Sequence, residues 1–327
     1  MRSVCIYGTG SYVPEEVVTN EQLAATAPTK PEWVETRLGI KTRRRARKDE
    51  STSDMAVEAA RKALEMAKME PEEVQLIILA TVTPDRLVPS AATTVQHKLG
   101  AGNAVAFDIN AACPGFIFAL STGTQFIKNG FFKNALIIGS DTLSKVNNYQ
   151  HRNCVFFGDG AGAIVIKDSN SSNGVLAIDF HSDGEGTDDL TVRGCGSEWP
   201  ASVEVLEQGG QFLIMDAKKV YKKAVVGMPE SIKTTLNIAN LTTDDITFVV
   251  PHQPNISLLK DCIKELGIPE DKLIITLDQY GNFSSGNIPL ALDKINRERR
   301  LKEGDILAFT SAGAGWTWGS IIMRWGE

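Results

Sequence analysis

Hydrophobic and polar positions follow helical and strand-like patterns along the chain, and the same order of patterns occurs twice. Residues 54–67 carry an amphipathic helical pattern and lead into an apolar run that begins at Val74. Residues 217–236 carry a second helical pattern, which Pro229 is expected to kink or interrupt, and they lead into an apolar run from Ile246. The two apolar runs, both predicted strands, begin 172 residues apart.

Two further pairs of segments repeat at nearly the same spacing. Apolar runs begin at Ala135 and Ile306, an offset of 171 residues. Turns rich in small and polar residues surround Cys113 and Asn282, 169 residues apart, and each turn precedes a helical pattern. Because strands, turns and helices follow in one order at one spacing, we predict two similar α/β halves. The period is far longer than the roughly 20–50 residues of a solenoid repeat.

A polar turn cluster, DSNSSNG from residue 168, marks the boundary between the halves, which we expect to span residues 1–170 and 171–327. Continuous apolar runs are typical of strands buried on both faces. These runs are VQLIILA, NALIIGS, FVV, LIIT and ILAFTSA. Loops at the carboxyl ends of such strands carry the chemistry in open α/β sheets. We therefore expect Cys113 and Asn282 to face each other near a pseudo-twofold axis.

Composition and charge exclude several classes of protein. The 327 residues are 43% hydrophobic and 23% charged, which is ordinary for a soluble enzyme and argues against disorder, collagen and coiled coil. No apolar stretch approaches the roughly 20 residues of a membrane helix, and the N-terminal apolar run is too short for a signal peptide. A formal net charge of −6 argues against a nucleic-acid-binding protein. We expect a cytoplasmic enzyme that contacts neither nucleic acid nor membrane.

Cysteine usage directs attention to one thiol. Five cysteines are scattered along the chain without a CxxC pair or zinc-like Cys/His spacing, so we expect neither a disulfide scaffold nor a metal site. Cys113 follows the predicted strand AVAFDI, and the next residue, Pro114, is of the type favoured in the first turn of a helix. The N–H groups and dipole of a helix N-terminus favour a thiolate, which makes Cys113 a candidate nucleophile. The alternative is a packed structural cysteine, as we expect for Cys5, Cys154, Cys195 and Cys262.

Two polar residues of the second half are candidates for the same site. His252 follows a buried strand in FVVPHQPN, where it is placed to act as acid, base or electrophile; the alternative is a histidine satisfied by local hydrogen bonds. Asn282 lies in a turn beside glycine, which by itself indicates only turn chemistry, but its relation to Cys113 in the repeat favours a function.

Two glycine-rich segments, FGDGAGAIVI and TSAGAGWTWGS, do not fit phosphate-loop spacing and lead into strand-like runs. We expect them to allow close backbone crossings or to aim amides at the site, with Gly313–Gly315 as oxyanion donors.

Taken together, these motifs resemble the β-ketoacyl-acyl-carrier-protein synthase III family of thiolase-like condensing enzymes. The resemblance covers essentially the whole chain and rests on NAACPGF, VPHQPN, YGNFSSGNIPLAL, FGDGAGA and GAGWTWGS, with GTGSYVPEEVVTN and PEWVETRLGI near the N-terminus. It implies a thiolase-like α/β fold of two duplicated halves in α-β-α-β-α layers, and a homodimer.

The resemblance also implies a reaction. Cys113 would be acylated by an acyl-CoA, and the amides of Cys113, Gly313, Ala314 and Gly315 would hold the oxyanion. His252 and Asn282 would bind the carbonyl of a malonyl thioester, carried by acyl carrier protein or CoA, while carbon dioxide leaves and a 3-oxoacyl thioester forms. Neither a metal nor a permanently bound cofactor is required, because the coenzyme A thioester is a substrate.

Further positions are carried over from the resemblance. The family's CoA contacts correspond to Thr29, Trp33, Arg37, Arg152 and Asn255. Trp33 and Arg37 are four residues apart, so on a helix they share a face. In the segment 81–92, Leu87 is expected to enter the acyl pocket of the neighbouring subunit.

Three departures from the family pattern bear on the substrate. Ser257 stands where an arginine usually helps to dock the acidic carrier, Ala217 replaces a glycine beside the CoA channel, and Ala312 replaces an aromatic residue at the acyl pocket. They favour a non-acetyl primer. They also keep open an alternative, a specialised acyltransferase or secondary-metabolite synthase with another acceptor and without standard carrier docking. A catalytically silent partner subunit is a third hypothesis, which the intact Cys–His–Asn set opposes.

The run KTRRRARK, residues 41–48, holds six cations. It is consistent either with a solvated basic loop or with a contact to CoA phosphates or to an acidic carrier.

Overall fold

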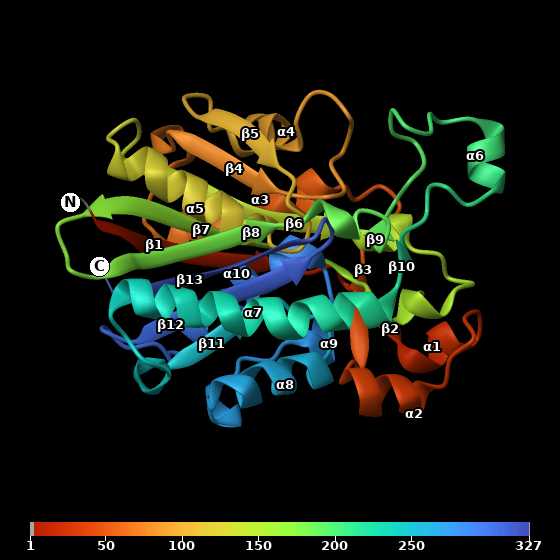
Figure 1. Ribbon diagram of the computed structural model, residues 1–327. Coiled ribbons are helices and arrows are strands. Elements are labelled where there is room, and N and C mark those ends of the chain that lie inside the picture. Colours follow the sequence, from red (N-terminus) through yellow and green to blue (C-terminus); the bar gives the residue numbers. More distant parts are fainter. Residues whose placement is uncertain (1–2, 327) are drawn as a thin grey trace.

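The computed structural model describes residues 3–326, and two large β-sheets form its framework (Figure 1). The first sheet has five strands. In spatial order they are β1 (Ser3–Tyr12), β7 (Asp159–Ser169), β6 (Asn134–Thr142), β4 (Leu76–Ala80) and β5 (Val105–Ile109). Strand β4 is parallel to both of its neighbours, and β7 is antiparallel to both of its own. Strand β5 therefore forms one edge of this sheet.

The second sheet repeats this order with one strand fewer. Its strands are β8 (Gly174–Ser182), β13 (Thr317–Arg324), β12 (Ile306–Gly313) and β11 (Phe248–Pro251). Here too the pair β11–β12 is parallel and the others are antiparallel. All five strands of the first sheet end by Ser169, and all four of the second begin at or after Gly174. The polar cluster from residue 168 thus lies at the passage from one sheet to the other.

Helices separate and cover the sheets in five layers (Figure 1). Between the sheets lie α5 (Gly115–Lys128) and α10 (Asn287–Arg297). The outer faces are covered by α3 (Thr52–Met66) and α4 (Ala91–Leu99) on one side and by α7 (Ala217–Ala239) and α8 (Ile256–Leu266) on the other. Buried side chains of α5, α10 and both sheets form one apolar core, which includes Phe116, Leu292 and Phe309. The expected α-β-α-β-α arrangement is therefore present.

Shorter elements surround this framework. They are β2 (Glu16–Thr19), α1 (Asn20–Ala24), α2 (Pro31–Trp33), β3 (Thr42–Arg45), β9 (Leu190–Thr191), α6 (Val203–Glu207), β10 (Ile214–Met215) and α9 (Leu277–Tyr280). Single turns of 3-10 helix occur at Pro71–Glu73, Leu143–Val146, Arg152–Phe156, Gly184–Gly186, Thr243–Asp245, Glu270–Lys272 and Ser284–Gly286, and a π-helical turn at Val34–Leu38. Helix α6 stands out from the body, whereas α1 and α2 lie near the end of α8 (Figure 1). Among residues 3–326, no helix is both long and apolar enough to span a bilayer.

Two predicted elements differ from expectation. Helix α7 passes through Pro229 without interruption, because Pro229 and the neighbouring Met228 are buried and tertiary packing offsets the lost N–H bond. The run LIIT does not form a strand and contributes only a bridge between Val249 and Leu273. Its backbone is instead bound by the Gln253 side chain, which donates to the Ile274 carbonyl and accepts from the Thr276 amide.

The basic run is partly exposed, as expected for a solvated loop, since Lys41, Arg47 and Lys48 are exposed, but part of it is built into the fold. Much of it is strand β3, paired with β2, and the Arg43 side chain is buried and donates to the carbonyls of Val18 and Val155. Arg45 forms an ion pair with Glu16. Arg43 and Arg45 are therefore bound within the chain, Arg43 by neutral acceptors and Arg45 by a carboxylate.

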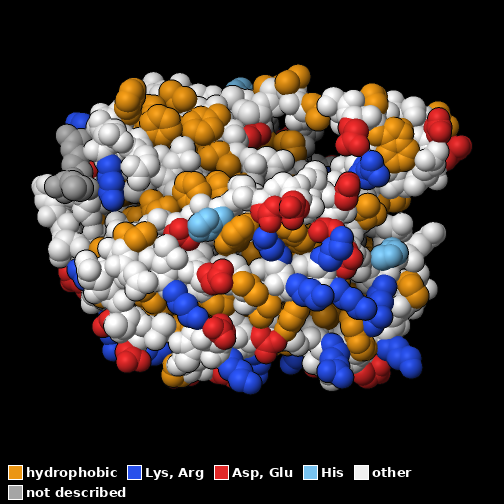
Figure 2. Space-filling view, in the orientation of Figure 1, with side chains coloured by type: hydrophobic (Ala, Val, Ile, Leu, Met, Phe, Trp, Pro, Cys, Tyr) orange, Lys and Arg blue, Asp and Glu red, His pale blue; other side chains and the backbone are white. Residues whose placement is uncertain are grey.

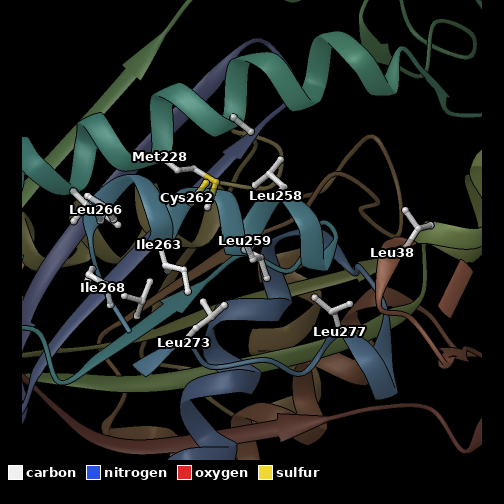
Figure 3. Close-up of a cluster of buried hydrophobic side chains, with 14 of the residues drawn as sticks. Leu38, Met228, Leu258, Leu259, Cys262, Ile263, Leu266, Ile268, Leu273 and Leu277 are labelled. Carbon is white, nitrogen blue, oxygen red and sulfur yellow. The ribbon is translucent and has the colours of Figure 1, made fainter. Parts of the chain in front are cut away.

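A second apolar cluster fills the space between α7, α8 and the second sheet (Figure 3). Met228 of α7 and Leu258, Leu259, Cys262 and Ile263 of α8 contribute to it. Cys262 thus serves packing, and Cys5 and Cys154 are buried as well, whereas Cys195 is half-buried.

Candidate active site

Cys113 lies in a tight turn between β5 and α5. The preceding Ala112 has φ +50°, a left-handed conformation that a residue with a Cβ atom seldom adopts, and its carbonyl accepts from the Gly115 amide at 2.9 Å. Pro114 is the N-cap of α5, so Cys113 directly precedes the cap of a buried helix. The strand–turn–helix setting predicted for this thiol is therefore the one observed.

Asn282 lies in a turn that is bound tightly to the first half of the chain. Its amide donates to the Phe156 carbonyl, and its carbonyl accepts from the Gly158 amide, both at 2.9 Å. Its side-chain Oδ1 accepts from the amide of Ser284, which has φ +54°. This bond leaves the Nδ2 group as the free donor end of the Asn282 amide.

The glycines of the FGDGAGA motif and of strand β6 permit this close approach. A Cβ atom at Gly139 would lie 2.3 Å from the Ser285 carbonyl oxygen, and one at Gly160 would lie 3.1 Å from the Phe283 ring. Side chains at these positions would push the Asn282 turn away from the first sheet. The motif therefore serves a backbone crossing, one of the two roles expected for it.

His252 follows β11 and is almost fully buried. Its amide donates to the Thr310 carbonyl at 2.9 Å, and its Nδ1 has no hydrogen-bond partner among the described residues. Burial lowers the pKa of His252 to about 4, although the nearby Ser284 backbone and Asn287 side chain oppose the decrease. The imidazole is therefore neutral at physiological pH and can accept a proton.

One cavity of about 380 Å³ brings the three candidate residues together. Cys113, His252 and Asn282 all line it, although they come from turns far apart in the sequence. Gly313, Ala314, Ala312, Ala217 and Asn255 line the same cavity. Its lining is mostly apolar, which suits an acyl chain and a pantetheine arm.

Burial determines the ionisation of Cys113. Burial, the largest effect, and the carboxylate of Asp141 together raise the pKa of the thiol to about 12, against the opposing effect of the Ser284 hydroxyl. The Ser284 hydroxyl itself makes no well-aligned hydrogen bond to a described residue. The helix terminus favours a thiolate, as predicted, but desolvation exceeds this effect and keeps the pKa of the thiol raised. The site pairs a neutral thiol with a neutral imidazole, so acylation requires a proton transfer.

Of the predicted oxyanion donors in the loop before β13, Gly313 and Ala314 line the cavity and Gly315 does not. Gly313 packs against the nucleophile so closely that a Cβ atom would lie 2.8 Å from the Cys113 nitrogen. The Thr317 hydroxyl lies 2.9 Å from both the Ala111 and the Ala314 carbonyls and ties this hairpin to the Cys113 turn. Gly315 lies beyond Ala314 in the hairpin turn and is not part of the cavity lining.

The predicted CoA contacts are placed unequally. The guanidinium of Arg152 stacks on the Trp33 ring at 3.8 Å from its centroid. Arg37 does not take this place, because residues 34–38 form a π-helical turn in which a spacing of four is less than a full turn. Asn255 caps α8 by accepting from the Leu258 amide at 2.9 Å, and the Thr29 hydroxyl is buried without a partner among the described residues.

The acyl-pocket candidates and the substituted docking position also differ in placement. Ala312 lines the cavity, whereas Leu87 is 85% exposed on its loop and does not reach the cavity of its own chain. Ser257 is exposed, and its hydroxyl donates to the Arg37 carbonyl at 3.1 Å.

Sequence reasoning missed most of the apolar lining. The residues concerned are Val82, Leu143, Phe156, Phe157, Leu190, Leu213 and Met215. They come from separate strands, turns and loops, and no common motif or spacing marks them.

Comparisons with known proteins agree with this geometry. A family model described as 3-oxoacyl-[acyl-carrier-protein (ACP)] synthase III matches residues 107–184, and one described as its C-terminal part matches residues 236–325. A protein of Clostridium acetobutylicum called beta-ketoacyl-[acyl-carrier-protein] synthase III is 44% identical over 326 residues, 99% of each chain.

Solved structures show the same fold. The 3-oxoacyl-[acyl-carrier-protein] synthase III of Aquifex aeolicus VF5 matches with a TM-score of 0.92 at 38% identity, covering 98% of this chain and 100% of that one. The corresponding enzyme of Pseudomonas aeruginosa PAO1 matches with a TM-score of 0.92 at 34% identity, covering 100% and 99%. The thiolase-like fold expected from the sequence is thereby confirmed.

Proposed function

Because this chain belongs to the 3-oxoacyl-[acyl-carrier-protein] synthase III family, we propose that it joins an acyl group from acyl-CoA to a malonyl thioester by decarboxylating Claisen condensation. It is an acyltransferase, and the product is a 3-oxoacyl thioester. The observation that carries this proposal is the convergence of Cys113, His252 and Asn282 on one apolar cavity. The names of the relatives do not favour the alternative of a specialised acyltransferase without standard carrier docking.

In the first half-reaction, Cys113 takes the acyl group. The neutral imidazole of His252 accepts the thiol proton, and the sulfur attacks the thioester carbonyl. The amides of Cys113 and Gly313 stabilise the tetrahedral oxyanion, with Ala314 next to them. The proton returns to the CoA thiolate as it leaves, so the acyl-enzyme forms without a net change of charge.

In the second half-reaction, the malonyl thioester loses carbon dioxide. The Asn282 Nδ2 group, oriented by the bond between its Oδ1 and Ser284, and an N–H of His252 donate to the malonyl thioester carbonyl. These bonds stabilise the enolate that forms as carbon dioxide departs. The enolate carbon attacks the acyl-enzyme, and the Cys113 thiolate leaves and recovers a proton.

Residues on the cavity side of the chain would hold the coenzyme. The stacked pair of Trp33 and Arg152 offers a flat, cationic surface for an adenine ring and its phosphates. The buried Thr29 hydroxyl and the Asn255 side chain offer polar contacts near the channel.

Exposed lysines support an acidic carrier protein as the donor of the malonyl group. Lys218, Lys219 and Lys222 lie exposed on the first turns of α7, where Figure 2 shows a gathering of basic side chains. Residues on another face of the same turns, Val220 and Tyr221, line the cavity. Lys218 and Lys222 can supply the docking cation that is missing at Ser257, whereas Lys219 is paired with Asp189. We also propose a cytoplasmic location.

The edge strand β5 supports a homodimer. Val105 at its start is 53% exposed, and two phenylalanines beside α5 are exposed as well: Phe131 just after the helix and Phe180, whose ring packs on Phe118. Figure 2 shows hydrophobic side chains gathered over α5 and β5. An unpaired edge beside an apolar surface suits a second copy of this chain, which would also receive Leu87. Each subunit would comprise the two thiolase-like halves 1–170 and 171–327.

The proposal is tested by following both half-reactions. Incubation with a panel of acyl-CoA substrates should add one acyl mass to the intact protein but none to the Cys113→Ala variant. Subsequent malonyl thioester should release carbon dioxide and form a 3-oxoacyl product. Acylation at another residue, or no carbon dioxide release with any primer, would overturn it.

A further inference from the structure

Asp141 is a buried carboxylate at the carboxyl end of β6, close to the candidate site but outside its cavity lining. Its Oδ1 accepts from the Val82 amide at 2.7 Å and from the hydroxyls of Thr81 and Thr83 at 2.9 and 3.1 Å. No lysine, arginine or histidine among residues 3–326 forms an ion pair with it. Burial raises the pKa of the Asp141 carboxyl, and the hydrogen bonds from Val82, Ser285, Thr81 and Thr83 oppose this increase.

The other carboxylate oxygen binds the second half of the chain. Oδ2 lies 2.9 Å from the Ser285 hydroxyl and 3.3 Å from the Ser285 amide. The Ser285 hydroxyl also lies 2.8 Å from the Ala80 carbonyl, so the two acceptors share its proton. The adjacent Ser284 amide donates to the Asn282 side chain. One carboxylate thus joins the segment 81–83 to the turn that orients Asn282.

Both joined segments face the cavity. Val82 and Thr83 line it on one side, and Asn282 and Ser284 line it on the other. We propose that Asp141 is a positioning residue that holds the Asn282 turn against the first sheet and so places the Asn282 amide for decarboxylation. This inference rests on the proposed function.

The bonding pattern explains why a carboxylate is needed. Five donor groups of Thr81, Val82, Thr83 and Ser285 point at two oxygens that only accept. An asparagine would present an NH2 group either to the donors of residues 81–83 or to those of Ser285. The buried donors on that side would lose their acceptor, and their segment would be released. The buried charge also contributes to the raised pKa of Cys113, which places it near the reacting groups.

Asp159 provides a matched control. It is equally buried, at the start of β7, and accepts from the Ala46 and Ser144 amides at 2.7 and 2.8 Å and from the Ser144 hydroxyl. It neither lines the cavity nor contributes to the pKa of Cys113. Asp159→Asn therefore alters a comparable buried network in which the carboxylate makes no hydrogen bond to residues 282–286. The backbone of the preceding Gly158 binds the Asn282 turn, and the substitution leaves that amide in place.

The test compares the two half-reactions in the full-length protein. Rapid-quench intact mass measures acylation by acyl-CoA, and carbon dioxide release from malonyl-CoA by the pre-acylated enzyme measures decarboxylation. Asp141→Asn should slow decarboxylation about 10- to 100-fold and change acylation by less than about threefold. Ser285→Ala should lower the ratio of the decarboxylation rate to the acylation rate, as Asp141→Asn does. Asp159→Asn and Ser144→Ala should leave this ratio unchanged.

Three outcomes separate success from failure. Equal loss of both half-reactions in Asp141→Asn and Ser285→Ala, with thermal unfolding monitored, would overturn the positioning role, as would a selective loss in Asp159→Asn. If Asp141→Asn does not fold, Ser285→Ala alone decides. If replacing Asn282 by alanine in the otherwise wild-type enzyme left decarboxylation unchanged, that result would instead refute the proposed function.

Discussion

At the scale of single residues, the ionisation of the site follows from burial. Cys113 and His252 share a cavity in which desolvation raises the pKa of the thiol and lowers that of the imidazole. Both groups are neutral at physiological pH, and neither carries a charge that binding an apolar acyl chain would have to desolvate. Cys113 and His252 therefore form no ion pair at rest, and charge develops in the site only when the thioester is attacked.

The first prediction concerns the pH dependence of thiol reactivity. With its pKa raised to about 12, Cys113 holds a thiolate fraction that rises about tenfold for each pH unit below that value. Alkylation of Cys113 by iodoacetamide, followed by mass spectrometry between pH 6.5 and 9.5 (roughly 2.5 to 5.5 units below the pKa), should rise steadily without a plateau. A plateau below pH 8 would reveal a resting thiolate and contradict the prediction. The half-buried Cys195 serves as the internal reference.

The sequence allowed the three site residues to be predicted but not their ionisation. The order of Cys113, His252 and Asn282 and their turn settings are visible as local motifs. Desolvation depends on what surrounds each group in three dimensions, so a helix terminus alone suggested a thiolate. Likewise, the stack of Arg152 on Trp33 joins residues 119 positions apart, whereas the helical spacing had suggested Arg37.

At the scale of elements, α7 has two different working faces. One side of its first turns lines the cavity through Val220 and Tyr221, and its exposed side carries Lys218, Lys219 and Lys222. An acidic carrier bound on the exposed side would reach the cavity by way of the same turns. The substitution at Ser257 on α8 is thus compatible with carrier docking on a neighbouring helix.

The second prediction tests this face. Lys218→Glu combined with Lys222→Glu should raise the KM for malonyl-acyl carrier protein about tenfold, and more at low salt, because a reversed rim charge opposes association. The KM for malonyl-CoA should change far less. Lys302 lies in the turn before β12, at the end of that strand away from Gly313 and the cavity. Lys302→Glu should therefore leave both KM values unchanged. Equal effects on both malonyl donors would contradict docking at this site.

Helices and strands were predictable where the spacing of apolar residues matched the regular period of a helix or a strand. The strands β4, β6, β11 and β12 and the helices α3 and α7 occupy the predicted segments. The run LIIT does not form a strand, because the Gln253 side chain binds its backbone groups. Within the basic run, the burial of Arg43 was not predicted. Both features arise from contacts between side chains and distant backbone, which periodicity does not record.

At the scale of the whole molecule, the open edge of the first sheet is the feature that most calls for a partner. Strand β5 ends the sheet beside exposed phenylalanines, and the exposed Leu87 lies on the loop that precedes α4. A homodimer formed at this edge would cover these groups and supply a residue to each neighbouring cavity.

The third prediction is a change of oligomeric state. Val105→Lys should shift sedimentation from dimer to monomer and reduce activity, because a charge would be placed in an apolar interface. Ile238→Lys is the matched control, since Ile238 is similarly exposed, at 56%, but lies on α7 on the opposite side of the molecule. A wild-type monomer, or equal dissociation by both variants, would refute an interface at β5.

The placement of α10 has a consequence for biosynthesis. This helix belongs to the second half, yet Asp293 accepts from Thr9 and Ser11 of β1 at 2.7 and 2.6 Å, and its apolar side packs in the core between both sheets. On the ribosome, residues 3–169 therefore emerge with α5 on the inner face of their sheet but with the part of that face over β1 and β7 uncovered. That part stays open until residues 287–297 are made, so the duplicated halves cannot mature one after the other as independent domains do.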